Sequence, residues 1–138
     1  MDNRFVRQEI LLGTDAMQKL ADSHVAVFGL GGVGSWTAEA LARAGVGEIT
    51  LIDHDDYGPT NINRQLGALT STMGMGKAEV MAGRVLDINP CAAVHVFKEK
   101  YSAQTREQLL ASGYDFIIDA IDMVSSKLDL IETAIRRG

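Results

Sequence analysis

A glycine-rich segment is the part of the sequence that most directly suggests a ligand-binding site. The run HVAVFGLGGVGS, residues 24–35, places Gly29, Gly31 and Gly34 in a G-x-G-x-x-G pattern after an apolar segment, with Gly32 between them. Glycine lets the backbone approach a ligand closely, and a helix that begins here points its free N–H groups at a phosphate. The pattern predicts a phosphate-binding turn. A tight strand-to-helix turn without a ligand is the alternative that the motif alone leaves open.

Acidic, amide and cationic side chains follow at places where a nucleotide site needs them. Asp53 ends the next apolar segment, about 20 residues after the glycines, where a βαβ nucleotide site carries its ribose ligand. A turn or helix-cap aspartate is the alternative at this position. The further candidates are Asp55, Asn61, Arg64, Lys77 and Asp122.

The cations among these candidates change the chemistry that the glycines would suggest alone. A glycine loop with a ribose acid suits a dinucleotide dehydrogenase, but arginine and lysine neutralise charge that develops in phosphoryl or nucleotidyl transfer. An aspartate opposite them can hold Mg²⁺. Each residue has an ordinary alternative: Lys77 exposed in a first helical turn, Arg64 in a surface ion pair, Asp122 as a helix N-cap. Their joint occurrence favours nucleotide chemistry.

Alternating strands and helices must position these residues. We expect strands over 24–28, 48–52, 93–97 and 114–118. We expect helices over 4–12, 15–21, 35–44, 77–88, 103–111 and 124–136, the last with an apolar stripe of Val124, Leu128, Ile131 and Ile135. This alternation predicts an α/β, Rossmann-like doubly wound fold, with a mainly parallel sheet and an N-terminal helical arm. The carboxyl ends of such strands share one edge, so the candidate residues should converge there.

Composition limits the class of protein. A length of 138 residues predicts one domain over 1–138, and 46% apolar with 22% charged residues is ordinary for a globular domain. The net charge of −5 argues against a broad nucleic-acid-binding face. No apolar run approaches the roughly 18 residues of a membrane span. The N-terminus has no apolar signal core and the single Cys91 fits a reducing compartment, so we expect a cytoplasmic protein without membrane contact.

Motifs along almost the whole sequence resemble those of the ubiquitin-activating-enzyme-like adenylyltransferases, which include activators of sulfur-carrier proteins. The motifs are R-F-x-R-Q (4–8), G-x-G-G-V-G-S (29–35), A-R-A-G-V-G (42–47), D-x-D (53–55), T-N-x-N-R-Q (60–65), G-K (76–77), I-N-P (88–90) and D-A-I-D (119–122). Within this superfamily the sequence looks most like the tRNA threonylcarbamoyladenosine dehydratases. Met123, Val124 and Lys127 favour that group, because sulfur-carrier activators usually carry Asn directly after the aspartate that matches Asp122.

The resemblance implies an enzyme that adenylates a carboxylate with ATP and Mg²⁺, after which the modified adenosine of a tRNA closes to a cyclic form. It assigns nucleotide binding to Gly29, Gly31, Gly32, Gly34, Asp53, Asp55, Asn61, Asn63, Arg64, Lys77 and Asp122. It assigns catalytic roles to Arg7, Arg64, Lys77 and Asp122, with Asp122 as the metal ligand. Arg7 matches an arginine that relatives lend to a partner subunit, which implies a homodimer.

Departures and alternatives accompany this resemblance. Tyr57 stands where relatives usually have Val, and Pro59 is unusual in the loop. The family's later strands and substrate-facing half are missing, so we expect the N-terminal portion of a longer protein whose absent parts contact tRNA. The main alternative is an activator that adenylates the C-terminal glycine of a ubiquitin-like sulfur carrier. A nucleotide-binding or dimerising module without activity is a third possibility, and an NAD-dependent oxidoreductase is a fourth.

Overall fold

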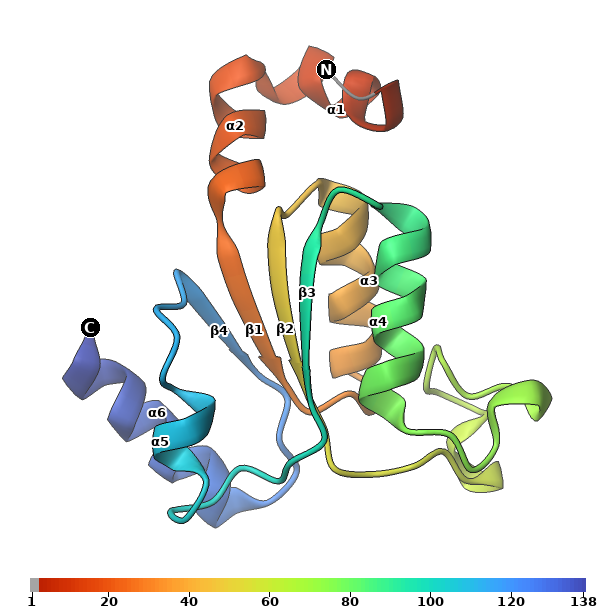
Figure 1. Ribbon diagram of the computed structural model, residues 1–138, viewed down its shortest axis with the longest axis vertical. Coiled ribbons are helices and arrows are strands. Elements are labelled where there is room, and N and C mark those ends of the chain that lie inside the picture. The colour runs from red at the N-terminus through yellow and green to blue at the C-terminus, as the bar shows by residue number, and fades with distance from the viewer. Residues whose placement is uncertain (1–2) are drawn as a thin grey trace.

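Four parallel strands form the centre of the molecule, which the computed structural model describes over residues 3–138 (Figure 1). They are β1 (His24–Phe28), β2 (Glu48–Ile52), β3 (Ala93–Phe97) and β4 (Phe116–Asp119). Their order across the sheet is β3-β2-β1-β4, and every neighbouring pair is parallel. The chain therefore builds outward from β1 to β3 and then crosses back to β4, which confirms the predicted doubly wound α/β fold and places the topological switch between β1 and β4.

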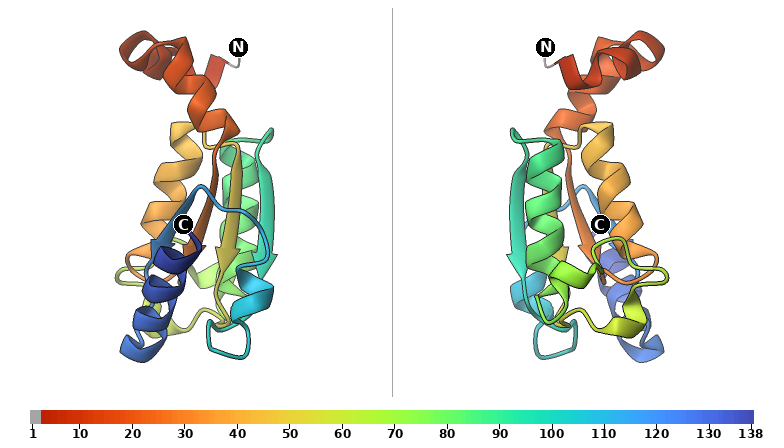
Figure 2. Two further views of the ribbon diagram at one scale, coloured as in Figure 1. Left: turned by 90° about the vertical axis from the view of Figure 1, so that its left-hand side faces the viewer. Right: turned by 90° about the vertical axis from the view of Figure 1, so that its right-hand side faces the viewer.

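Helices cover both faces of this sheet. They are α1 (Val6–Leu12), α2 (Thr14–Asp22), α3 (Gly34–Ala44), α4 (Lys77–Ile88), α5 (Arg106–Leu109) and α6 (Val124–Arg137), with 3-10 turns at Asn3–Phe5, Pro59–Asn61 and Thr70–Thr72. Figures 1 and 2 show α3 and α4 on one face, α5 and α6 on the other, and α1 with α2 as an arm beyond the end where the strands begin. In the part of the chain that is described, no helix has both the length and the apolar character needed to cross a membrane.

The central strand β1 divides the core into two clusters. Val25 and Val27 pack among the buried side chains of α3 and α4, whereas Ala26 and Phe28 pack with Leu109 of α5 and with α6. All five residues of β1 are buried, as expected for a parallel strand covered on both faces. Because the strand is fixed from both sides, its carboxyl end is a rigid base for the glycine loop that follows.

A buried carboxylate joins the two helices of one face. Glu39 on α3 accepts hydrogen bonds from Arg84 on α4 at 2.5 Å and from Arg43 one turn further along α3 at 2.8 Å. The hydrogen bond from Arg84 is the largest influence on the pKa of the Glu39 carboxyl, which lies below its ordinary value despite burial. The Glu39–Arg84 ion pair fixes α4 against α3, and with α4 its first-turn residue Lys77.

Two predicted elements, one helix and one strand, had the wrong bounds, and local hydrogen bonds give the reason. The helix expected over 103–111 is the single turn of α5, because the Thr105 hydroxyl accepts from the Ser102 amide at 2.9 Å and donates to the Lys100 carbonyl at 2.7 Å. Those bonds hold a turn where a helix would otherwise begin. The strand expected over 114–118 begins two residues later, because the Tyr114 hydroxyl turns back to the Leu109 carbonyl at 2.7 Å.

The apolar stripe expected on the last helix exists, but the described part of the chain does not cover it. Val124, Leu128 and Ile135 are 67%, 61% and 76% exposed, and Ile131 is also exposed. The helix instead packs inward through Leu130, which joins the cluster around Phe28. The stripe is therefore on the outer side of α6, facing away from the sheet.

The glycine loop depends on an unusually close backbone contact. Gly29 has φ of +92°, and a Cβ atom on Gly34 at the start of α3 would lie 1.7 Å from the Gly29 carbonyl oxygen. No side chain fits in that space, so the first turn of α3 can rest on the loop only because Gly34 lacks one.

We expect Gly34→Ala to lower the free energy of unfolding by about 2 kcal/mol or more, because the loop and α3 must separate to admit the methyl group. The matched control is Gly83→Ala in α4, where a Cβ atom would meet no atom within 4 Å. That change should raise stability by about 0.5–1 kcal/mol through helix propensity. Urea denaturation of both variants measures the difference, and equal effects would contradict the proposed steric origin.

Candidate functional site

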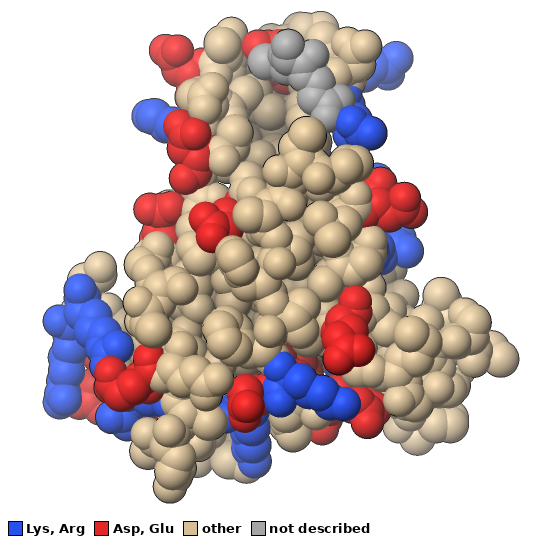
Figure 3. Space-filling model, in the orientation of Figure 1, with Lys and Arg blue, Asp and Glu red and all other residues tan. Residues whose placement is uncertain are grey.

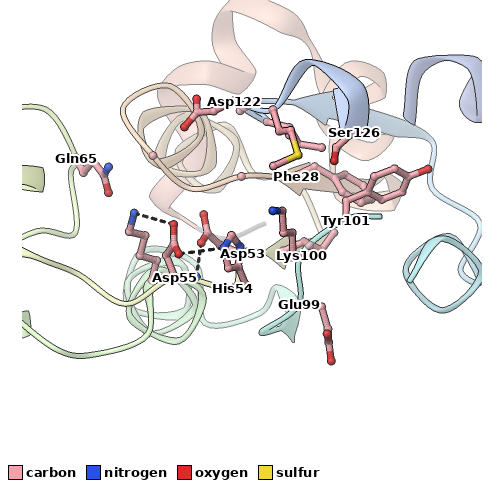
Figure 4. A pocket seen from close by; sticks show the side chains of 17 residues that line it. Phe28, Asp53, His54, Asp55, Gln65, Glu99, Lys100, Tyr101, Asp122 and Ser126 are labelled. Carbon is pink, nitrogen blue, oxygen red and sulfur yellow. Dashed lines mark hydrogen bonds and ion pairs between the residues drawn. The ribbon is translucent and has the colours of Figure 1, made fainter. Parts of the chain in front are cut away.

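A cavity of about 210 Å³ lies where the four strands end. It brings together six of the predicted site residues, Gly29, Gly31, Asp53, Asp55, Lys77 and Asp122. Asp122 lies across the cavity from Asp53 and Asp55 (Figure 4). The carboxyl ends of β1, β2 and β4 and the start of α4 therefore supply the groups that the sequence predicted would converge.

Asp53 connects the end of β2 to the glycine loop. Its Oδ2 accepts a hydrogen bond from the Leu30 amide at 2.7 Å, and its Oδ1 accepts one from the Asp55 amide at 2.8 Å. The carboxylate thus holds the loop open beside the cavity. Each oxygen still has a free lone pair, so the same carboxylate can also accept from a ligand hydroxyl.

Lys77 is a buried cation at the edge of this cavity. It is only 6% exposed, although it is the first residue of α4, so the alternative of an exposed first-turn lysine was wrong. Its Nζ lies 3.8 Å from Asp55 Oδ2 and 5.9 Å from the centre of the Tyr57 ring. A buried ammonium with one distant carboxylate keeps hydrogen-bond donors available for an anion.

Asp122 is exposed and lines the opposite wall. The N-cap position of α6 belongs to Met123 and has no side-chain capping bond, so Asp122 does not act as the N-cap that was its alternative role. The nearby Asp119 pairs with Lys127 at 2.9 Å instead. Asp122 is therefore the acidic group after β4 that faces the cavity.

Three predicted residues of the loop after β2, Asn61, Asn63 and Arg64, do not line the cavity. The side chain of Arg64 lies over Gly32, where a Cβ atom would be 3.3 Å from Arg64 Cγ, and its guanidinium donates to the Thr60 carbonyl and to Asn63 Oδ1. Asn61 accepts from the Gly58 amide at 2.9 Å. These bonds hold the loop in shape, and Arg64 must exchange its partners to reach a ligand in the cavity.

Arg7 lies far from this cavity within its own chain. It is an exposed residue of α1, in the arm at the end of the sheet where the strands begin (Figure 1). The cavity is at the other end, so the structure does not bring Arg7 together with the other predicted catalytic residues.

Gln65 and Lys100 are among the lining residues that the sequence analysis did not assign to the site. Gln65 is 6% exposed, and its Oε1 has no hydrogen-bond partner among the described residues. An unpaired buried acceptor beside a cavity is costly, so it indicates a ligand or solvent partner there. Lys100 follows β3 and also lines the cavity (Figure 4). The rule that residues after parallel strands share one edge, applied to β3, would have found it.

The charges of the cavity suit a metal-bound polyphosphate. Carboxylate and imidazole atoms of Asp53, His54 and Asp55 lie within 4.8 Å of one another, and carboxylate oxygens are ligands that Mg²⁺ accepts. Polyphosphate alone would be repelled by these carboxylates, whereas a bound cation together with Lys77 and Lys100 would offset its charge. The cavity is smaller than the roughly 300–1,000 Å³ of most small-molecule sites, so a nucleotide would extend beyond it along the glycine loop.

Comparison with known proteins identifies the relatives of this chain. Residues 5–138 match the model of the ThiF family. The tRNA threonylcarbamoyladenosine dehydratase of Bacillus subtilis is 46% identical over 137 residues, which cover 99% of this chain and 54% of the relative. The enzyme of that name from Escherichia coli is 50% identical over 128 residues, covering 93% and 48%. The chain spans about half the length of the curated relatives it matches.

Solved structures agree with the sequence comparison. The crystal structure of the E. coli dehydratase TcdA in complex with ATP superposes with a TM-score of 0.95 at 48% identity, covering 97% of this chain and 55% of that one. A more distant relative, the E. coli sulfur carrier protein ThiS adenylyltransferase, is 31% identical over 129 residues, covering 92% of this chain and 51% of the relative.

Tyr57, the departure noted in the loop, offers a test of how this region is packed. Its ring is buried beneath the loop, and its hydroxyl has no partner among the described residues. Burial, with a smaller contribution from Asp53, raises the pKa of Tyr57 to about 12, so the hydroxyl stays neutral. The hydroxyl also fills the space beside Gly67, where a Cβ atom would lie 2.0 Å from it.

We expect Tyr57→Phe to leave the free energy of unfolding unchanged or to raise it by up to about 1 kcal/mol, because it removes a buried donor without a partner. The matched control is Tyr114→Phe, which loses the 2.7 Å bond to the Leu109 carbonyl and should be destabilised by about 1 kcal/mol. Urea denaturation compares the two. A clear loss of stability in Tyr57→Phe would mean that the hydroxyl has a partner after all.

Proposed function

The chain belongs to the ThiF family, and we propose that it is the nucleotide-binding part of an enzyme that uses ATP to adenylate a carboxylate. One observation carries the proposal: the glycine loop, the buried Lys77 and the three aspartates Asp53, Asp55 and Asp122 meet at one cavity. The similarity to TcdA, which was solved with ATP, supports the same assignment. Residues 1–138 would form a single ATP-binding domain.

Each group at the cavity has a place in ATP binding under this proposal. The Leu30 amide is already bonded to Asp53, so the other N–H groups of the glycine loop would face the phosphates, and Asp53 would accept from the ribose. Lys77 would contact the triphosphate from its buried position, and Arg64 would join it after releasing the Thr60 carbonyl. Asp122 would hold Mg²⁺ from its own wall of the cavity, and the ion would supply positive charge against the triphosphate when bound.

The chemistry follows from this charge distribution. A carboxylate oxygen of the substrate attacks the α-phosphorus, forming a new P–O bond while the bond to the β-phosphate oxygen breaks. Pyrophosphate leaves with the electron pair, and an acyl-adenylate remains. Lys77 and Arg64 stabilise the charge that accumulates on the phosphate oxygens in this step. An internal nucleophile of the same substrate then attacks the acyl carbon, which releases AMP and closes a ring.

We propose the threonylcarbamoyl-modified adenosine of a tRNA as the substrate. The identities of 46% and 50% to dehydratases named for that nucleoside support it over the sulfur-carrier alternative, of which an E. coli representative is 31% identical. This chain has a net charge of −5, and the face drawn in Figure 3 has acidic and basic groups interspersed. The basic surface for tRNA would therefore lie on other parts of the protein, which would act in the cytoplasm where its tRNA is found.

The substrate assignment is tested by ATP–pyrophosphate exchange with the protein that carries this chain. We expect exchange to require tRNA bearing threonylcarbamoyladenosine and to be absent with a carrier protein that ends in two glycines. Exchange that depends on the carrier, and not on the tRNA, would favour the alternative. Tight binding of Mg-ATP with no exchange under either condition would favour a binding module without activity.

The same assay tests the residues. Asp122→Ala and Lys77→Met should each lower exchange by about 100-fold or more with the fold retained, because each removes charge stabilisation of the transferring phosphate. Lys98→Met is the matched control: this exposed lysine pairs with Asp56 at 2.8 Å and does not line the cavity. Near-normal exchange in both test variants would remove the residue assignment.

A homodimer is part of the proposal, because Arg7 can reach a cavity only in another copy of the chain. The arm that carries it also exposes Ile10 and Leu11, at 78% and 83%, which is a large apolar surface for so short a helix. Under this proposal a second copy covers this surface and receives Arg7 at the edge of its own cavity.

Mixing inactive variants tests that arrangement. We expect Arg7→Ala and Asp122→Ala to be inactive alone, and an equal mixture after subunit exchange to regain about a quarter of the exchange activity, because half of the dimers then have one intact site. The control is a mixture of Lys77→Met with Asp122→Ala. Both residues act in the cavity of their own chain, so every cavity in a mixed dimer lacks one of them, and this mixture should regain no activity. A mixture of Arg7→Ala with Asp122→Ala that stays inactive would show that Arg7 does not act across subunits.

A further inference from the structure

Three potential metal ligands meet at the end of the sheet opposite the cavity. His24 and Glu48 are the first residues of β1 and β2 and pair in register, and His95 of β3 pairs with Thr50 of β2. Successive side chains of a strand alternate between faces, so Glu48 and Thr50 point to the same side. The register therefore places His24, Glu48 and His95 on one face, across three neighbouring strands.

The side-chain atoms confirm this gathering. His95 Nε2 lies 2.8 Å from Glu48 Oε1, and His24 Nδ1 lies 3.6 Å from the same oxygen. One candidate ligand atom from each of the three residues falls within 4.8 Å of the other two. In a tetrahedral site with bonds of about 2.0–2.2 Å, ligand atoms lie roughly 3.5 Å apart. Modest rotation of the side chains would therefore bring the three ligand atoms to the spacing of a metal site.

The arrangement around His24 is the one that a metal-binding imidazole needs. The ring is buried, with its Nε2 2.8 Å from the Thr50 hydroxyl and its centroid 4.8 Å from that of the Tyr114 ring, in a T-shaped arrangement. With Nε2 donating to Thr50, the lone pair of Nδ1 points towards Glu48. Such outer hydrogen bonds fix the tautomer and the orientation of metal-binding histidines.

We propose that His24, Glu48 and His95 bind a divalent transition-metal ion, with Zn²⁺ the best fit. Two imidazoles and one carboxylate match the ligands that Zn²⁺ takes, and a water molecule would complete four-fold coordination. His24 is the fixed ligand, while Glu48 and His95 are partly exposed and free to adjust. The site involves none of the nucleotide-cavity residues and does not rest on the proposed function.

A bound ion would add a link across three strands beyond their backbone hydrogen bonds, their shared core and the two side-chain hydrogen bonds. It would bind the folded chain, in which the strands are in register, and not the unfolded chain. Zn²⁺ should therefore raise the melting temperature. The alternative is that the His95–Glu48 and His24–Thr50 hydrogen bonds are purely structural and no ion enters.

The three histidines of this sequence allow a matched test. Zn²⁺ is titrated calorimetrically into chelator-treated protein, in a Cys91→Ser background because the exposed thiol is itself a zinc ligand. We expect a single Zn²⁺ per chain and a higher melting temperature. His95→Ala should weaken binding by about tenfold or more and remove the thermal shift. His95 is on an edge strand and exposed, so its loss leaves the core intact.

His54→Ala is the control, because His54 belongs to the competing acidic cluster beside the nucleotide cavity. It should bind Zn²⁺ like the parent chain, while Glu48→Gln should resemble His95→Ala. Loss of binding in His54→Ala with retention in His95→Ala would place the ion at the cavity and overturn the proposal. Absence of binding in the parent, or weak binding that no substitution changes, would overturn it as well.

Discussion

The fit of the glycine loop against the strand ends is the constraint on which the rest of the structure depends. The carbonyl oxygen of Gly29 lies so near Gly34 that a methyl group there would overlap it, and Gly29 itself is closed in by the Ala120 carbonyl after β4. Asp53 fastens the same loop from β2 through the Leu30 amide. The loop is thus held by contacts from the ends of β2 and β4 as well as by its own strand β1, and the Arg64 side chain lies over Gly32.

Most of the fold was predictable because the hydrophobic pattern of each main element extends over many residues, so that no single side chain decides the element. The fully buried β1 and the amphipathic α4 each contain a run long enough to fix the element type, and their observed ranges match the predicted ones. The weak elements α5 and β4 differ because single side chains decide them. Thr105 replaces a helical turn with its own hydroxyl bonds, and Tyr114 folds back onto α5. Such bonds depend on which backbone groups lie near the side chain in space, and the local hydrophobic periodicity of the sequence does not predict that.

The candidate site was predictable in its location but not in the orientation of its side chains. The carboxyl-end rule placed Asp53, Asp55 and Lys77 at one edge, and the structure brings them together. It did not predict that the guanidinium of Arg64 would be bound by its own loop. Gln65 was not predicted either, because nothing in the sequence distinguishes an uncharged amide whose burial and lack of a hydrogen-bond partner appear only in the structure.

The two ends of the sheet carry different chemistry on shared strands, which bears on how a ligand at one end would affect the other. β1 and β2 hold His24 and Glu48 at their first residues and lead into the glycine loop and Asp53 at their last. Coupling between sites requires that one ligand prefer a conformation that the other alters. Both strands are buried along most of their length and hydrogen-bonded in register, so shifting either strand would break many contacts. A metal at the amino end should therefore stabilise the fold while leaving nucleotide affinity nearly unchanged, because stability and coupling arise from different properties of the same strands.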